Sequence, residues 1–448
     1  MKREAYFALH ASRTTLHDLC TQRITNNKMG ILNDNYICAL DIGSSKVAGC
    51  MAILKKGRIG NIYFDSVALK GIEKGVIVDS VNLIIAVTAL VKKLKALSGM
   101  NIKFVHVNIS GKNLFAKHSR AIIPLAERGN KVITVSDIHR VNEQARILAS
   151  SLEDEIIHAI PFNYIIDSKT SVISPIGLYS HSLEADLYLV CAKLSAVQNL
   201  SRVIHQSGYE MKKLFFSGLA VSKAVFNCEF LKGLNLLCDI GGDVTELLIF
   251  RDGALVDMEI LFIGGNDLTK CLQEELRIPF DLAEDIKRSH GLLGKVESIA
   301  PDKEILVKKE QSYRPIKLKF LAEILNSRAN SICQEIKGAV EKKVALHQVN
   351  NFIVTGRSIL LEGFIETLEA NLSVPVKSGG ILNPDIPLSI KENDALSGRK
   401  YLNYLSCLGM ICDALQIGPQ IIPPAAALSK NFIINAMSRI KEVYQEYF

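Results

Sequence analysis

Two acidic residues, Asp41 and Asp239, stand at equivalent places in two similar stretches of the sequence. Each follows an apolar run and precedes Ile-Gly, in YICALDIGSSKVAGCMAIL (36–54) and in LNLLCDIGGDVTELLIF (234–250). A carboxylate at the end of a strand can hold a hydrated Mg²⁺, and the backbone N–H groups of a glycine turn can bind phosphate. Two such hairpins facing one cleft could grip the phosphates of a nucleotide. We therefore predict Asp41 and Asp239 as metal-holding and catalytic residues of one site.

Each acid belongs to a unit of three strands and two turns. The second strands are predicted at 47–54 and 247–250, the glycine-containing hairpin turns at 55–58 and 251–254, and the third strands at 62–69 and 255–260. Apolar runs bounded by turn residues are typical of buried strands. Glycine hairpins are common, so two similar units could arise by chance. The acid that ends the first strand in both units favours a true repeat.

The composition excludes several classes of protein. The 448 residues are 48% hydrophobic and 22% charged, which suits a globular protein of two to four domains. The sequence contains no uninterrupted run of about 18 apolar residues, so we expect no membrane-spanning helix. The formal charge of +7 comes without a basic block interleaved with aromatics, which argues against nucleic-acid binding and allows mild attraction to an anionic membrane.

The ten cysteines are scattered without CxxC spacing, so we expect no zinc site and reduced thiols in the cytosol. The first 28 residues are polar and contain no apolar core of a signal peptide. We interpret residues 1–33 as a flexible extension, or as the product of a start assigned too early, because Met29 lies shortly before the first strand.

Several motifs resemble the actin-like ATPase superfamily. DIGSSKVAG (41–49) and CDIGGDVTELLIF (238–250) are similar to its two phosphate loops, and FIVTGRSILLEGF (352–364) is similar to its adenosine loop. GIEKGVIVD (71–79) and VHVNISG (105–111) match the segments after the first loop. The block at 135–190 resembles the inserted subdomain of one family within it, the bacterial FtsA cell-division proteins. That block separates the chain from DnaK-type chaperones, sugar kinases and actin.

The resemblance implies an α/β fold of the actin-like, duplicated ribonuclease H-like type. Two major domains would surround a nucleotide cleft, and a small α+β subdomain of the FtsA type would be inserted into the first. The expected divisions are subdomain 1A at 34–111, 191–222 and 401–417, the insert 1C at 112–190, subdomain 2A at 223–262 and 350–400, subdomain 2B at 263–349, a linker at 418–430 and a helix at 431–448.

The resemblance also implies the residues that bind ATP and Mg²⁺. In the first loop the backbone of Gly43, Ser44 and Ser45 would donate to the β-phosphate, and Lys46 would supply a countercharge. The remaining expected cofactor-binding residues are Gly241, Gly242, Asp243, Thr245, Glu284, Lys287, Gly356, Arg357 and Ser358, besides Asp41 and Asp239. Glu284 and Lys287 are one helical turn apart. Taken without the resemblance, they read as an ordinary surface ion pair.

Two residues depart from the family pattern. Asp243 stands where the second phosphate loop usually has a third glycine, and Arg357 stands where the adenosine loop usually has a second one. The exchange of the later acid of the second loop for Glu246 is milder. One hypothesis is that Arg357 reaches toward Asp243 or the nucleotide and offsets the extra charge. The other is that the pocket no longer binds ATP tightly. In either case we expect at most a slow ATPase.

The resemblance implies protein partners for two regions. The insert, with a predicted helix at 137–148 and strands at 158–168 and 183–193, would contact successive subunits and other division proteins. Subdomain 2B, with a polar loop within 301–319 and a helix at 321–344, would receive the C-terminal tail of the tubulin-like protein FtsZ. His139 and His158 have no accompanying nucleophile, so we expect structural roles for both.

The last 18 residues segregate apolar and polar side chains with a helical period, and would span about 27 Å as a helix. Such a helix could dock on the core of the protein, or it could lie in a membrane interface. The preceding linker and the terminal position favour the membrane. The side chains expected to insert are Phe432, Ile433, Met437, Ile440, Tyr444, Tyr447 and Phe448.

These features predict an adaptor that binds ATP, self-assembles, and tethers FtsZ to the cytoplasmic face of the bacterial inner membrane at the division site. One alternative is a small-molecule kinase with the actin fold, which would need a substrate-side acid beyond the two loop aspartates. The other is a pilus-assembly protein similar to PilM, which would not be expected to carry both the 135–190 block and the terminal helix.

Overall fold

The computed structural model describes residues 35–126, 129–227, 230, 232–294, 296–309 and 312–416. The predicted extension at 1–33, the linker at 418–430 and the terminal helix with its seven membrane residues lie outside the described residues. Among the described helices, none combines the length and the apolar character that crossing a membrane would require.

A five-stranded sheet forms the first domain around Asp41. Its order is β13-β6-β1-β2-β3, with β1 antiparallel to β2 and parallel to β6. The predicted second strand is confirmed, while the third begins four residues earlier than predicted, directly after the turn. The strands are β1 (Tyr36–Ile42), β2 (Lys46–Lys55), β3 (Arg58–Ala68), β6 (Phe104–Ile109) and β13 (Glu210–Phe216).

A second five-stranded sheet repeats this pattern around Asp239. Its order is β16-β15-β14-β19-β20, again with the first strand antiparallel to the second and parallel to the fourth. The shared order confirms the internal repeat that the two hairpins predicted. The strands are β14 (Leu234–Ile240), β15 (Thr245–Arg251), β16 (Ala254–Leu261), β19 (Val349–Thr355) and β20 (Val376–Ser378).

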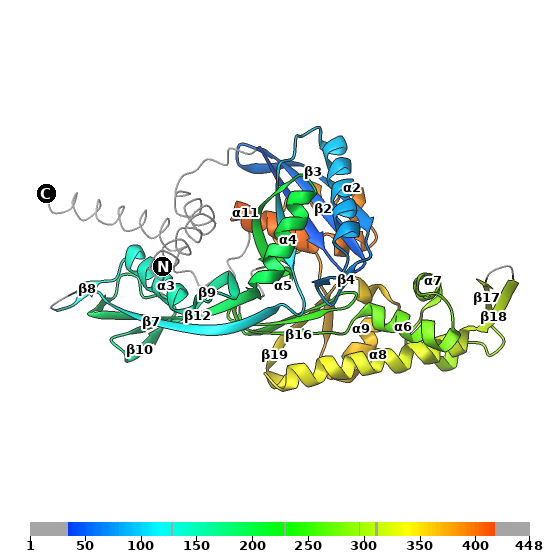
Figure 1. The fold of residues 1–448 in the computed structure, drawn as a ribbon. Helices are drawn as coiled ribbons and strands as arrows, with labels where there is room; N and C mark the ends of the chain where they lie inside the picture. The colour runs from blue at the N-terminus through cyan, green and yellow to red at the C-terminus, as the bar shows by residue number, and fades with distance from the viewer. Residues whose placement is uncertain are drawn as a thin grey trace, which may run out of the picture.

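Helices cover both sheets (Figure 1). On the first domain α2 begins after Asp79, whose side chain caps the helix by accepting from the Asn82 N–H, and it ends at Gly99 in the left-handed region. Gly409 of α11 approaches the backbone of Ala220 in α5 so closely that a Cβ would overlap it. The helices are α2 (Ser80–Ser98), α4 (Leu194–Gln206), α5 (Ser217–Val225) and α11 (Leu405–Leu415), and on the second domain α6 (Gly265–Leu276), α7 (Phe280–His290), α8 (Leu318–Glu341), α9 (Phe364–Leu372) and the short α10 (Leu388–Lys391).

The inserted region forms a lobe with its own apolar core. Its four-stranded sheet has the order β10-β9-β12-β7, and α3 packs on one face. A capping box between Thr134 and Asp137 starts this helix two residues before the predicted position. The elements are β7 (Leu114–Pro124), α3 (Val135–Ala149), β9 (Asp154–Ile166), β10 (Thr170–Val172) and β12 (Ser182–Lys193), with a small pair β8 (Lys131–Val132) and β11 (Tyr179–Ser180).

The polar stretch at 301–319, predicted to contain a loop, is mostly strand. Two antiparallel strands, β17 (Glu304–Lys309) and β18 (Ser312–Lys317), form a separate hairpin before α8. The sequence does not alternate between apolar and polar residues here, because apolar side chains occupy exposed as well as buried positions. Leu306 and Tyr313 are exposed, while Val307 and Ile316 are buried. The predicted helix at 321–344 is present as α8, shifted by three residues at each end.

His158 joins the inserted lobe to the first domain, because its Nε2 accepts a hydrogen bond from the Phe216 N–H over 3.0 Å. Burial, reinforced by the nearby charge of Lys213, lowers its pKa from 6.5 to about 3. The unfolded chain therefore binds a proton that the folded chain does not, and stability decreases as pH falls from about 6.5 toward 3.

We expect His158→Gln to remove part of this pH dependence, because glutamine can still accept from Phe216 but does not titrate. Between pH 7 and pH 5 the wild-type protein should lose at most about 2 kcal/mol more unfolding free energy than the variant. Urea denaturation at both pH values measures the difference. His139→Gln, on the exposed side of α3, is the control and should keep the wild-type slope. Equal slopes for both variants would contradict the assignment.

Candidate nucleotide site

A cavity of about 570 Å³ lies where the two repeated hairpins meet. Residues of both domains line it. Thirteen of the predicted site residues are among them: Asp41, Gly43, Ser44, Ser45, Lys46, Asp239, Gly241, Gly242, Glu284, Lys287, Gly356, Arg357 and Ser358. Asp243 and Thr245 are not among the lining residues.

The turns of the two hairpins have the same hydrogen-bond pattern. The Gly43 N–H donates to the Lys46 carbonyl over 3.0 Å, and the Gly241 N–H donates to the Val244 carbonyl over 2.9 Å. Each turn therefore begins two residues after its acid and presents its small residues to the cavity. Such turns leave backbone donors near a bound anion.

Asp41 is held by a polar network of the first domain. The Asn108 side-chain amide donates to the Asp41 carboxylate over 2.5 Å and to the Ser217 hydroxyl over 2.7 Å. The Ile42 N–H donates to the Asn108 side-chain oxygen over 2.7 Å, which fixes the orientation of the amide. Burial raises the pKa of Asp41, although Lys46 and Asn108 act in the opposite direction.

Asp239 takes the matching place in the second domain. The Thr355 hydroxyl donates to its carboxylate over 2.8 Å. Burial, together with the negative charge of Asp41, raises its pKa to about 6. The charge of Asp41 raises the pKa of Asp239, which agrees with the position of both acids at one cavity. Two enclosed carboxyls with raised pKa values are stabilised in the ionised form by a cation, so this pair fits a hydrated divalent metal.

Lys46 is directed to the C-terminal part of the first domain. Its Nζ donates to the side-chain oxygen of Asn403 over 2.5 Å and to the Asn403 carbonyl over 3.2 Å. Burial lowers the pKa of Lys46 to about 8, although Asp41 acts to raise it. The ammonium group thus stands at the cavity wall with a neutral partner that a phosphate could replace.

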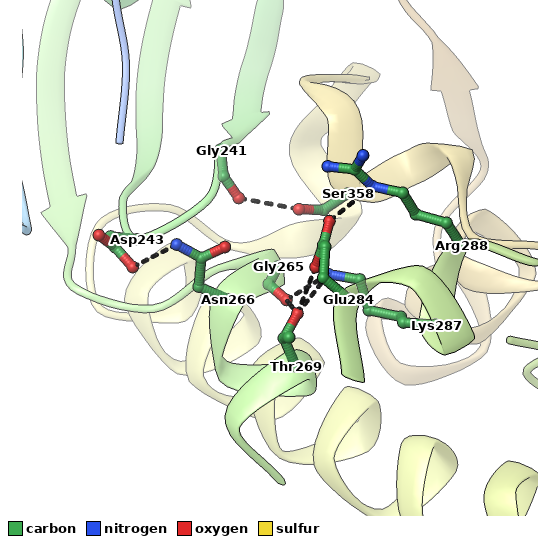
Figure 2. Close-up of polar contacts among 9 residues, drawn as sticks. All are labelled: Gly241, Asp243, Gly265, Asn266, Thr269, Glu284, Lys287, Arg288 and Ser358. Carbon is green, nitrogen blue, oxygen red and sulfur yellow. Dashed lines mark hydrogen bonds and ion pairs between the residues drawn. The ribbon is translucent and has the colours of Figure 1, made fainter. Parts of the chain in front are cut away.

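Glu284 and Lys287 line the cavity and form an enclosed ion pair beside Gly265, the first residue of α6 (Figure 2). Their charged groups are 2.6 Å apart, and the side chains are 19% and 11% exposed, so they are not an ordinary surface pair. Lys287 also donates to the Gly265 carbonyl over 2.8 Å and to the Thr269 hydroxyl over 2.7 Å. Arg288 donates to the second oxygen of Glu284 over 2.7 Å.

Asp243 is turned away from the cavity and is only 7% exposed. It accepts from the Asn266 side chain over 2.8 Å and from the Lys74 N–H over 3.4 Å. No ion pair between Asp243 and Arg357 occurs among the described residues, so their expected contact is absent there. The Thr245 hydroxyl, predicted as a ligand, instead donates to the Ile263 carbonyl over 2.9 Å.

Two family models match the chain, and together they cover more than half of it. The model of the SHS2 domain inserted in FtsA matches residues 111–191, and the model of the cell-division protein FtsA matches residues 236–402. The chain belongs to the FtsA family of actin-like cell-division proteins.

FtsA proteins of distant bacteria are similar over most of their length. The FtsA of Borreliella burgdorferi is 25% identical over 387 residues, covering 85% of this chain and 91% of that protein. The FtsA of Neisseria meningitidis is 26% identical over 349 residues, covering 77% of this chain and 83% of that protein.

One solved structure supports the fold, and a second is similar with a lower TM-score. A chain of a PilM–PilN type IV pilus biogenesis complex superimposes with a TM-score of 0.58 at 14% identity, covering 84% of this chain and 98% of that one. MreB5 of Spiroplasma citri bound to ADP gives a TM-score of 0.49 at 13% identity, covering 85% and 98%. The predicted actin-like α/β fold with an inserted subdomain is confirmed.

Several residues that line the cavity were not predicted as site residues from the sequence. Ser110 donates its hydroxyl to Glu246, whose pKa is raised by burial and by Asp239, and both line the cavity. The second carboxyl oxygen of Glu246 and the Ser406 hydroxyl are buried without a hydrogen-bond partner in the described part of the chain. The VHVNISG motif could have indicated Ser110. Nothing in the sequence brings Ser406 to this site.

Proposed function

We propose that this FtsA-family chain binds ATP with Mg²⁺, assembles with copies of itself, and tethers FtsZ filaments to the inner face of the cytoplasmic membrane at the division site. In that position it would also help to recruit later division proteins. The observation that carries the proposal is the single cavity between two duplicated hairpins, in a chain that both FtsA family models match.

The cavity offers one group of residues for each part of the nucleotide. Asp41 and Asp239 would hold Mg²⁺ through water, and the metal would neutralise phosphate charge when it is bound. The two glycine turns would donate backbone N–H groups to the phosphates, with Lys46 as countercharge. The far end, with Glu284, Lys287, Gly356, Arg357 and Ser358, would take the adenosine.

Hydrolysis in this site would be slow at most. The ammonium group of Lys46 donates to Asn403, so a phosphate must compete with an existing hydrogen bond. Arg357 is a long side chain that lines the adenosine end, and its burial lowers its pKa. Part of the binding energy would therefore be used to rearrange side chains. The nucleotide would serve chiefly to control assembly.

Three surfaces would contact partners. Subdomain 2B, which contains α6, α7 and α8, would bind the C-terminal tail of FtsZ, and the inserted lobe would contact neighbouring subunits and other division proteins. The terminal segment at 431–448 would lie in the membrane interface. One amphipathic helix binds a bilayer reversibly, and a filament that presents many of them would bind firmly through multivalency.

Sedimentation with lipid vesicles and FtsZ tests the proposal. With ATP and Mg²⁺ we expect vesicles containing anionic lipid to carry both this protein and FtsZ into the pellet, and FtsZ alone to remain in the supernatant. Recruitment should fall by about tenfold when the C-terminal tail of FtsZ is removed, because the tail is the expected ligand. Failure to recruit FtsZ in any nucleotide condition would contradict the adaptor role.

A further inference from the structure

Asp243 occupies a position in the second phosphate turn that links three parts of the protein. Asp243 is 7% exposed and does not line the cavity, although its two neighbours in the chain, Gly242 and Val244, do. One carboxylate oxygen accepts from the side chain of Asn266, near the start of α6, over 2.8 Å. The other accepts from the Lys74 N–H of the first domain over 3.4 Å. The carboxylate thus bridges the two domains.

The donor in the first domain is fixed in place. Lys74 lies in the left-handed region, with φ of 49°, in the turn between β4 (Ile72–Glu73) and β5 (Val76–Ile77). Its carbonyl accepts from the Lys112 N–H over 3.1 Å. A Cβ on Gly75 would overlap the backbone of Ser110, so the turn rests directly on the segment after β6. The Lys74 N–H is therefore a preformed donor for an anion on the other side of the cleft.

A second bond crosses the cleft beside the first. The Ser110 hydroxyl donates to Glu246 of β15, three residues after Asp243. The same hairpin therefore reaches the first domain twice. Ser110, Gly75 and Asn266 also line the cavity, so both bonds lie beside it.

We propose that Asp243 supplies, from within the protein, a bridge across the cleft between the second phosphate turn and the first domain, in place of the bridge that the γ-phosphate of a nucleotide would form. The cavity then does not prefer a nucleoside triphosphate over the diphosphate. This inference rests on the proposed nucleotide site and specifies which nucleotide that site selects.

The reason is thermodynamic. A ligand shifts an equilibrium between open and closed domains only by its difference in affinity for the two states. With Asp243 already bonded to Lys74 and Asn266, the two domains are bridged without a γ-phosphate, so closure does not require one.

Calorimetric titration of the full chain with Mg²⁺–ATP and Mg²⁺–ADP tests the inference. The two dissociation constants of the wild-type protein should agree within about fivefold. In Asp243→Gly, which restores the glycine of the family pattern, ATP should bind at least about tenfold more tightly than ADP. Asp243→Asn keeps the size of the side chain but removes its charge, and it should shift the preference toward ATP by about threefold.

Asp252→Gly is the matched control. It removes an exposed acid from the turn at the other end of β15, where the Asp252 carboxylate accepts from the Gly233 N–H. The ratio of its dissociation constants for ATP and ADP should equal that of the wild-type protein. Circular dichroism reports whether each variant is folded. If Asp243→Gly does not fold, the nucleotide preference of Asp243→Asn tests the role of Asp243.

The outcomes separate the two proposals. Wild-type protein that binds neither nucleotide would overturn the nucleotide site, and this inference with it. A wild-type preference for ATP above about fivefold, or unchanged ratios in Asp243→Gly and Asp243→Asn, would overturn the role of Asp243 and leave the nucleotide site standing.

Discussion

Removal of residues 431–448 should abolish sedimentation of this protein with anionic lipid vesicles. The apolar positions of one helical period hold four aromatic side chains, two phenylalanines and two tyrosines, and three isoleucines, while the polar positions repeat on the other side. The segment carries two basic and two acidic side chains, so its attraction to anionic lipid is small. Insertion of the apolar face must therefore supply most of the binding energy.

A matched pair of substitutions separates this explanation from a general loss of structure. Ile440→Glu places a charge in the apolar face, where insertion would bury it, and should reduce vesicle binding by at least about tenfold. Ser438→Glu adds the same charge to the polar face and should reduce binding much less, since that side chain remains in water. Vesicle sedimentation measures both. Undiminished binding of the truncated protein would contradict the anchor and favour docking on the protein core.

The internal repeat could be predicted because it is encoded by local patterns. Each acid follows an apolar strand and precedes a glycine turn, and short patterns of this kind determine hairpins. Two hairpins of the same form imply two sheets of the same order, and the position of the acid places it at the edge where the sheets meet. Eight of the thirteen predicted residues that line the cavity belong to these two hairpins, and the other five were implied by the family resemblance alone.

Contacts between distant segments could not be predicted in this way. Asn403 is 357 positions from Lys46, and only the path of the chain back to the first domain brings them together. Thr245 follows the phosphate turn as a ligand would, yet its side chain points to the Ile263 carbonyl because β15 alternates its two faces. Asp243 reads from the sequence as a charge beside a phosphate, whereas its hydrogen bonds turn it from the cavity.

Replacement of Gly356 by alanine should destabilise the protein and weaken the cavity together. Gly356 has φ of 88° and ψ of 165°, a region open essentially to glycine alone. A Cβ there would also overlap the backbone of Ile240, which immediately precedes the second phosphate turn. We expect a loss of about 3 kcal/mol or more, and a melting temperature lower by about 3 °C or more.

Gly99→Ala is the control, because it isolates the backbone term. Gly99 has φ of 69° and ψ of 8° at the end of α2, and no heavy atom lies within 4 Å of its added Cβ. This variant should lose only about 1 kcal/mol. Thermal unfolding and titration with Mg²⁺–ATP are measured for both variants. Only Gly356→Ala should also lose affinity for ATP, because relieving the overlap moves the predicted adenosine loop away from the second phosphate turn. Equal losses of stability, with ATP affinity retained in both, would show that Gly356 is not required for the close approach of that corner to Ile240.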